Sequence, residues 1–135
     1  MNANGNVMNG SAGKRSYKLM IVDDSNIMRR RIERSQQFEE LELIGTAGNG
    51  LEAIELFRKM DPDVVTMDLT MPQMDGIECI SKLVELKPAI RILVISALAD
   101  KATAVEAMEK GANGFLNKPF TDRQLNEAIA DLIRE

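Results

Sequence analysis

The residues best suited to chemistry in this sequence are polar side chains that end short apolar runs. Asp23 and Asp24 follow one run of four apolar residues, and Asp68 follows another. Ser96 and Lys118 come at the ends of two further runs. If the runs are parallel strands, their carboxyl ends meet at one edge of the sheet, where open α/β sheets bind ligands. We therefore expect these five residues to share one site.

Three carboxylates in one crevice repel each other and need a counter-charge. An all-oxygen cluster that leaves room for water suits Mg²⁺, and Lys118 can supply an ammonium. A divalent cation and an ammonium beside a free carboxylate oxygen neutralise the charge that develops in phosphoryl transfer. Asp68 would then be the nucleophile and form an aspartyl phosphate, and Ser96 could donate a hydrogen bond to a phosphoryl oxygen.

The apolar runs that would place these residues alternate with amphipathic stretches. The runs lie at 19–22, 43–44, 64–67, 92–95 and 115–116. Three of them are apolar at consecutive positions, which is typical of parallel strands covered on both faces. The order is strand then helix, five times. Right-handed crossovers would place helices on both faces of a five-stranded parallel sheet, so the predicted fold is a doubly wound α/β domain.

The helices can be assigned from their apolar stripes and their terminal residues. We expect the first helix over Ser25 to about Gln37 and a capping box of Thr121 and Gln124 before the last helix. Gly111 is placed for the C-terminal cap of the fourth helix. The predicted inward-facing residues are Met28 and Ile32; Leu51, Ile54 and Phe57; Ile77, Ile80, Leu83 and Val84; and Leu125, Ala128, Ile129, Leu132 and Ile133.

Composition and charge exclude several classes of protein. Seventeen basic residues against 21 acidic ones give a net charge of −4, which argues against a nucleic-acid clamp. The absence of His excludes His-based triads and histidine metal sites. A single Cys forms no intramolecular disulfide and favours a reducing compartment. The sequence has no stretch typical of a signal peptide or membrane insertion, so we expect a cytoplasmic protein.

The chain divides into a short tail and one domain. Residues 1–16 are rich in Asn and Gly and contain little that could pack, so we expect a flexible tail. Residues 17–135 form the predicted domain, with no further domain after it.

Four motifs together resemble the receiver domain of two-component response regulators. They are VDDS at 22–25, VTMDLTMPQMDG at 65–76, SA at 96–97 and KPF at 118–120. The similarity runs from about Tyr17 to Glu135 and is strongest to chemotaxis-type single-domain regulators. It implies a flavodoxin-like sheet with the strand order 2-1-3-4-5.

The resemblance also implies a role for each motif residue. Asp68 would be the phosphoacceptor, and Asp24, Asp68 and the backbone carbonyl of Thr70 would contact Mg²⁺, with Asp23 assisting. Ser96 and Lys118 would bind the phosphoryl group.

Ser96 and Phe115 would act as the switch residues, and the Lys118–Pro119 peptide would be cis. Many relatives have Asn at the position of Thr70 and a charged residue at that of Leu98. The lifetime of the phosphorylated state in those relatives therefore does not carry over to this chain.

By this resemblance the phosphoryl donor would be a sensor histidine kinase or a histidine phosphotransfer protein. Phosphorylation would switch binding to a protein partner through the face formed by the fourth helix, fifth strand and fifth helix. The chain would catalyse only its own phosphorylation and dephosphorylation. A role as phosphorelay intermediate or phosphate sink remains open.

Two other classes of function compete with this one. An aspartate-nucleophile phosphatase of the haloacid dehalogenase type needs a second Asp two residues after the nucleophile, where this chain has Thr70. A flavodoxin-like module needs a first loop rich in Ser, Thr and Gly, whereas residues 23–26 read DDSN.

A basic run, Arg29, Arg30, Arg31 and Arg34, stands out in the first predicted helix of this acidic chain. It is either a solvated face or a docking surface for an acidic histidine phosphodonor.

Overall fold

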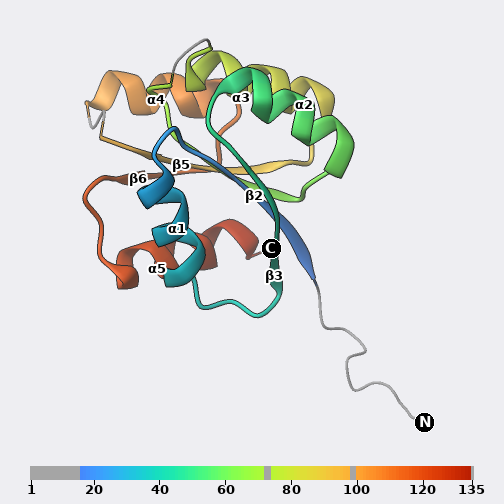
Figure 1. Cartoon of the computed structure of the whole chain (residues 1–135). Helices are drawn as coiled ribbons and strands as arrows, with labels where there is room; N and C mark the ends of the chain where they lie inside the picture. Colours follow the sequence, from blue (N-terminus) through green and yellow to red (C-terminus); the bar gives the residue numbers. More distant parts are fainter. Residues whose placement is uncertain (1–15, 72–73, 98–99, 135) are drawn as a thin grey trace, which may run out of the picture.

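The computed structural model describes residues 16–71, 74–97 and 100–134. Strands and helices alternate along the chain (Figure 1). They are β2 (Tyr17–Val22), α1 (Asn26–Ser35), β3 (Leu41–Ala47), α2 (Gly50–Met60), β4 (Val64–Met67), α3 (Gly76–Leu86), β5 (Arg91–Ser96), α4 (Lys101–Glu109), β6 (Gly114–Asn117) and α5 (Asp122–Ile133). Apart from Ser16, the predicted tail lies outside the described residues, as does Leu98.

The described residues form a five-stranded sheet in the order β3-β2-β4-β5-β6. Every neighbouring pair of strands is parallel. The second described strand therefore lies at one edge, followed by the first, third, fourth and fifth. This confirms the predicted order 2-1-3-4-5 and places β2 and β4 side by side at the centre.

Helices cover both faces of the sheet, as predicted. α1 and α5 lie on one face, and α2, α3 and α4 lie on the other (Figure 1). Side chains of β2 alternate between the two cores: Leu19 and Ile21 pack toward α1 and α5, and Met20 and Val22 pack toward the opposite helices. Both sets are apolar because both faces of the strand are buried.

Polar side chains fix the points at which the helices begin. The Ser25 hydroxyl accepts a hydrogen bond from the Met28 amide at 3.2 Å at the start of α1. Thr121 and Gln124 form the predicted capping box at the start of α5. Gly111 follows α4 with φ of 118°, a conformation that side chains with a Cβ rarely adopt. These caps confirm the sequence assignment of three helix ends.

Two details of the sequence assignment are wrong. Leu51 is 53% exposed rather than inward-facing. The buried face of α2 is instead Gly50, Ala53 and Phe57, because a stripe chosen only from large apolar residues misses small ones. α1 ends at Ser35 rather than near Gln37, since the backbone at Gln36 is already extended.

The side chain of Asn126 in α5 binds the backbone at the end of α1. Its amide nitrogen donates to the carbonyls of Ser35 at 2.9 Å and Asp122 at 2.8 Å. Its carbonyl oxygen accepts from the Gln37 amide at 2.8 Å. One side chain thus satisfies backbone groups where α1 ends, which is where helices leave carbonyls unpaired.

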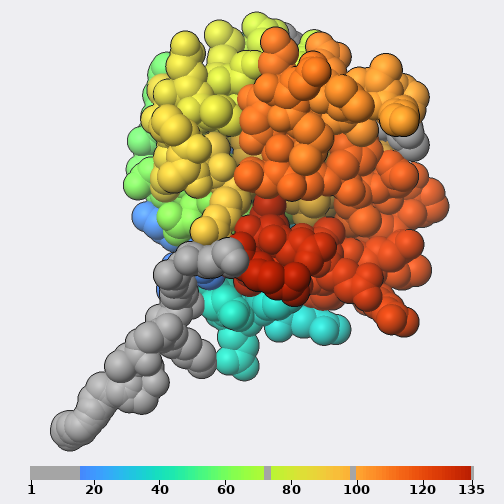
Figure 2. All heavy atoms as spheres, turned by 180° about the vertical axis from the view of Figure 1, so that it is seen from behind, coloured from blue at the N-terminus to red at the C-terminus, as the bar shows by residue number. Residues whose placement is uncertain are grey.

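α4 is held less firmly than α5. Among the residues of α4, all of which the structure describes, Ala107 alone is buried. Val105 is 46% exposed and Met108 is 44% exposed. In Figure 2, which shows the molecule from behind, α4 (orange) lies above α5 (red). Within the described ranges, every helix is too short or too polar to cross a bilayer.

Candidate functional site

The two acidic motifs meet because their strands are neighbours in register. Val22 pairs with Met67 across β2 and β4, so the residues that follow each strand lie side by side. The backbone hydrogen bonds continue past the strand ends: the Asp68 amide donates to the Val22 carbonyl at 2.9 Å, and the Asp23 amide donates to the Ala47 carbonyl at 3.0 Å. The backbone ladder itself therefore places the acidic residues.

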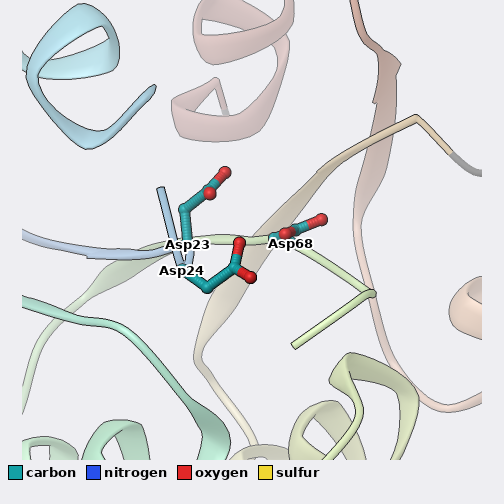
Figure 3. Close-up of side chains that lie close together, drawn as sticks. All are labelled: Asp23, Asp24 and Asp68. Carbon is teal, nitrogen blue, oxygen red and sulfur yellow. The ribbon is translucent and has the colours of Figure 1, made fainter. Parts of the chain in front are cut away.

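Three carboxylates converge at this edge of the sheet (Figure 3). One oxygen from each of Asp23, Asp24 and Asp68 lies within 4.8 Å of the other two. Asp23 is 1% exposed and Asp68 is 3% exposed, whereas Asp24 is exposed. The cluster therefore has a buried side and an open side.

The ammonium of Lys118 is the described cation that faces this cluster. It lies 2.8 Å from Oδ2 of Asp23 and 3.8 Å from Oδ1 of Asp68. Only 18% of the Lys118 side chain is exposed. Buried charges require such a partner. One ammonium among three carboxylates leaves the described site with an excess of negative charge.

The pKa of Asp68 is raised above its ordinary value of 3.8. Burial is the largest cause, and the charges of Asp23 and Asp24 add to it. Lys118 and a hydrogen bond from the Thr70 amide act in the opposite direction. A carboxylate held in this way gains stability from any further positive charge that reaches it.

Backbone contacts hold the two buried carboxylates in place. Oδ1 of Asp23 accepts a hydrogen bond from the Ser25 amide at 2.9 Å. Oδ1 of Asp68 accepts longer bonds from the amide and hydroxyl of Thr70, at 3.4 and 3.5 Å. Asp68 is thus less tightly held by hydrogen bonds than Asp23. This leaves its oxygens more available to a ligand.

Gly76 allows the segment that follows β4 and the start of α3 to approach closely. A Cβ at this position would lie 2.4 Å from the carbonyl oxygen of Asp68 and 2.6 Å from Cα of Leu69. The Gly76 amide also donates to the Leu69 carbonyl at 2.9 Å. Any side chain here would displace the backbone that carries Asp68.

The remaining predicted site residues lie on the next two strands. Ser96 is the last residue of β5 and is fully buried. Its carbonyl accepts a hydrogen bond from the Lys118 amide at 3.0 Å. Phe115 lies in β6 opposite Val94 of β5, and its half-buried ring packs on the side of the sheet that carries α2, α3 and α4. The Lys118–Pro119 peptide is cis, as predicted.

The sequence analysis missed the contacts that two arginines of the basic run make with the backbone of neighbouring segments. Arg29 donates to the Asp23 carbonyl at 2.5 Å and also binds the Asn26 side chain. Arg31 donates to the Phe120 carbonyl at 2.5 Å. The alternative of a solvated face is therefore wrong for these two residues, whereas Arg30 and Arg34 are exposed and fit either alternative. Nothing in a run of arginines indicates which of them turns inward.

A groove of about 600 Å³ opens from the site toward α4. Asp24 and Thr70 line it near the site, and Thr103 and Glu106 line it on α4. The open side of the carboxylate cluster is thus reachable from solvent between the β4–α3 segment and α4.

Comparison with known proteins agrees with this geometry. The family model described as "Response regulator receiver domain" matches residues 19–130. The chain is 38% identical over 112 residues to chemotaxis protein CheY of Listeria monocytogenes, which covers 83% of this chain and 94% of that protein. It is 39% identical to CheY of Thermotoga maritima over 112 residues, covering 83% and 93%.

A likeness to an enzyme is confined to part of that enzyme. The chain is 45% identical over 119 residues to a protein-glutamate methylesterase/protein-glutamine glutaminase of Pseudoalteromonas atlantica, covering 85% of this chain and 31% of that protein. The activity of that longer protein therefore does not carry over to this chain.

Among solved structures, the fold is similar to the CheX–CheY–BeF₃–Mg complex of Borrelia burgdorferi. The TM-score is 0.86 at 30% identity, covering 95% of this chain and 96% of that chain. The receiver-like acidic edge, the strand order and these similarities lead to one conclusion: the chain belongs to the response regulator receiver domain family and is similar to the chemotaxis regulators called CheY.

Proposed function

We propose that Asp68 accepts a phosphoryl group in a Mg²⁺-dependent reaction and that the chain acts as a CheY-like signalling switch. The observation that carries this proposal is the meeting of three carboxylates within 4.8 Å, with the Lys118 ammonium 2.8 Å from Asp23 and 3.8 Å from Asp68. Membership of the receiver family supports the same assignment. The donor would be a sensor histidine kinase or a histidine phosphotransfer protein.

The donor set of the site fits Mg²⁺. All the candidate ligands are oxygens, and Asp24 leaves one side open to water. Burial is the largest cause of the raised pKa of Asp68, and the charges of Asp23 and Asp24 add to it, so a bound cation would stabilise the ionised carboxylate. Asp24, Asp68 and the Thr70 carbonyl would hold the ion, and Asp23 would assist. Bound there, Mg²⁺ would neutralise charge on the phosphoryl oxygens.

The residues of the chain account for the transfer itself. A carboxylate oxygen of Asp68 attacks phosphorus, the bond from phosphorus to the donor imidazole nitrogen breaks, and its electron pair stays on that nitrogen. The Lys118 ammonium and the Ser96 hydroxyl would hold the phosphoryl oxygens as charge builds on them. Water attack on the same phosphorus would break its bond to the Asp68 oxygen and release inorganic phosphate, which returns Asp68 to its carboxylate. The chain would thus act only on its own phosphoryl group.

A conformational change on phosphorylation would be transmitted from Ser96 through β5 to α4. Ser96 ends β5, and Phe115 pairs with Val94 of the same strand. A shift of Ser96 toward a phosphoryl group would therefore be transmitted to β6, which contacts α5 and whose Phe115 packs against the same core as Ala107 of α4. The exposed Val105 and Met108 of α4 offer an apolar contact to a protein partner at the α4–β6–α5 face.

The exposed part of the basic run supports a docking site for the phosphodonor on α1. Ile27 is 81% exposed. Arg30 and Arg34 follow it at helical spacing and are exposed too. An apolar residue flanked by two cations complements an acidic surface with an apolar centre, and α1 begins just after the acidic motif.

Phosphorylation by a small donor tests the proposal directly. The protein is incubated with acetyl phosphate and Mg²⁺, and the intact mass is measured. We expect one added phosphoryl group, none after Mg²⁺ is removed with EDTA, and none in Asp68→Asn. The control is Asp131→Asn, since Asp131 is an exposed residue of α5 paired with Arg134. Labelling that survives Asp68→Asn would refute the assignment.

The role of Lys118 is tested by comparing binding with transmission. Amide chemical shifts of α4 and β6 are recorded with Mg²⁺ alone and with Mg²⁺ plus beryllofluoride. We expect Lys118→Ala to abolish the beryllofluoride-dependent shifts of these elements while Mg²⁺ affinity changes little. Equal loss of both would contradict this division of roles.

A further inference from the structure

Arg31 is the residue of α1 that reaches the loop carrying Lys118. Its guanidinium donates to the carbonyl of Phe120 at 2.5 Å and lies 3.5 Å from the carboxylate of Asp122. The guanidinium carbon also lies 4.2 Å from the centre of the Phe120 ring, a distance typical of cation–π contact. The Arg31 side chain therefore makes three contacts with this segment: two with Phe120 and one with Asp122.

The loop between β6 and α5 is held at both of its ends. At one end the Lys118 amide donates to the Ser96 carbonyl at 3.0 Å. At the other end Phe120 is 4% exposed and packs in the core shared by α1 and α5. The Lys118 side chain leaves the loop at the first anchor, two residues before Phe120.

The reach of the Lys118 ammonium depends on where this backbone lies. The lysine stem is flexible, but only 18% of the Lys118 side chain is exposed, so the surrounding packing and the backbone that carries it restrict where the ammonium can lie. The ammonium sits nearer to Asp23, at 2.8 Å, than to Asp68, at 3.8 Å. A small displacement of the loop would therefore change its contact with the proposed acceptor.

We propose that Arg31 is a positioning residue for Lys118: by holding Phe120 from α1, it sets the distance between the Lys118 ammonium and Asp68. This inference rests on the proposed phosphoacceptor role of Asp68. The Arg31 side chain is 35% exposed, so it is not needed to fill the core. Its planar guanidinium both donates to a carbonyl and stacks on a ring, which a lysine ammonium cannot reproduce.

The first test measures the rate of phosphorylation of the full chain by acetyl phosphate at saturating Mg²⁺. We expect Arg31→Met to react about fivefold more slowly, which corresponds to about 1 kcal/mol, the net value of one hydrogen bond. Arg31→Lys keeps the charge and the stem and should give an intermediate rate. Mg²⁺ affinity, measured without a phosphodonor, should be unchanged in both variants.

Arg123→Met is the matched control. Arg123 lies three residues after Phe120, is 87% exposed and pairs with Glu127. Its loss removes one arginine charge near the same loop, and the rate should stay that of the wild type. A wild-type rate in both Arg31 variants, or the same reduction in Arg123→Met, would overturn the inference.

A double-mutant cycle separates positioning from general stability. If Arg31 acts through Lys118, Arg31→Met should slow phosphorylation in the wild type but not in Lys118→Ala. Its effect on the thermal midpoint should be the same in both backgrounds. An equal fold-reduction of the rate in both backgrounds would overturn the inference. Where Arg31→Met does not fold, the same cycle is run with Arg31→Lys.

Labelling of the wild-type protein distinguishes a failure of this inference from a failure of the proposed function. If the wild type takes no phosphoryl group, or if labelling survives Asp68→Asn, the proposed function fails and the inference fails with it. If labelling requires Asp68 but the Arg31 variants react at the wild-type rate, the inference alone fails.

Discussion

The helix pair α1–α5 on one side of the sheet and α4 on the other side differ in how firmly they are held. On the first side, Asn126 bonds to backbone groups at the end of α1, and Arg31 bonds to the Phe120 carbonyl. On the second, Ala107 is the one buried residue among those of α4, all of them described, and Val105 is 46% exposed. The acidic cluster lies at the edge where the two sides meet.

This difference suggests a division of labour within one small domain. Groups that bind a phosphoryl oxygen must be held in place before the reaction, because pre-organised charge is what stabilises the transition state. A segment that reports the reaction must instead have a second arrangement close in free energy. Lys118 lies on the loop whose Phe120 packs in the core of α1 and α5. Ser96 instead ends β5, which α4 follows along the chain.

Leu125→Ala should have the largest effect on stability, because it breaks the firmly held side. Leu125 is fully buried in α5, in the core shared with α1. Removing its side chain leaves a cavity and should cost about 3 kcal/mol, measured by urea unfolding. A cost below about 1 kcal/mol would show that α5 is no better packed than α4.

Gly76→Ala should cost roughly 2 kcal/mol, because the new Cβ would lie 2.4 Å from the Asp68 carbonyl oxygen. The displaced backbone should also slow phosphorylation of Asp68. Gly48→Ala is the control, since its Cβ would meet only side-chain atoms, the nearest being Nη1 of Arg29 at 3.3 Å. Equal unfolding free energies for the two variants would contradict this account of the α3 contact.

Asp68→Asn should stabilise the metal-free protein at pH 7. Burial, the largest cause, raises the pKa of Asp68 above 3.8. The folded state therefore holds this proton more tightly than the unfolded chain, and stability is lost as the pH rises through the folded pKa. Asn avoids that loss, so we expect Asp68→Asn to have the higher free energy of unfolding at pH 7.

The gain should shrink as the pH falls and vanish below pH 3.8, where the carboxyl is protonated in both states. The measurement is thermal unfolding in EDTA across this range. Asp131→Asn, at an exposed site, should show no such pH dependence. A gain that persists unchanged at low pH would contradict the assigned cause.

Val105→Ser should have the smallest effect on stability, within about 0.5 kcal/mol, because Val105 is already half exposed. It should still weaken binding of a protein partner at the α4–β6–α5 face. Urea unfolding measures the first effect. A cost above about 1 kcal/mol would mean that α4 is packed as firmly as α5.

The sequence allowed the sheet and the acidic edge to be predicted, because both follow from local patterns. Apolar runs mark strands buried on both faces, and residues such as Asp23 and Asp68 that end these strands must share an edge. The inward face of α2 was mispredicted at Leu51, since Gly50 and Ala53 give no hydrophobic signal.

The contacts of Arg31 could not be predicted from the sequence for a different reason. Its partner Phe120 lies 89 residues further along the chain. No local pattern encodes a pairing at that separation. Such a contact becomes visible only when the fold brings α1 beside α5.

The hydrogen bonds of the Asp23 and Asp68 amides to the neighbouring strands also govern how the chain tolerates changes of length. Side chains in a strand point to alternate faces, so one inserted residue before either aspartate would turn its carboxylate to the opposite face. Insertions between α1 and β3, by contrast, leave that alternation intact. Insertions and deletions should therefore be confined to loops at the end of the sheet opposite the acidic cluster.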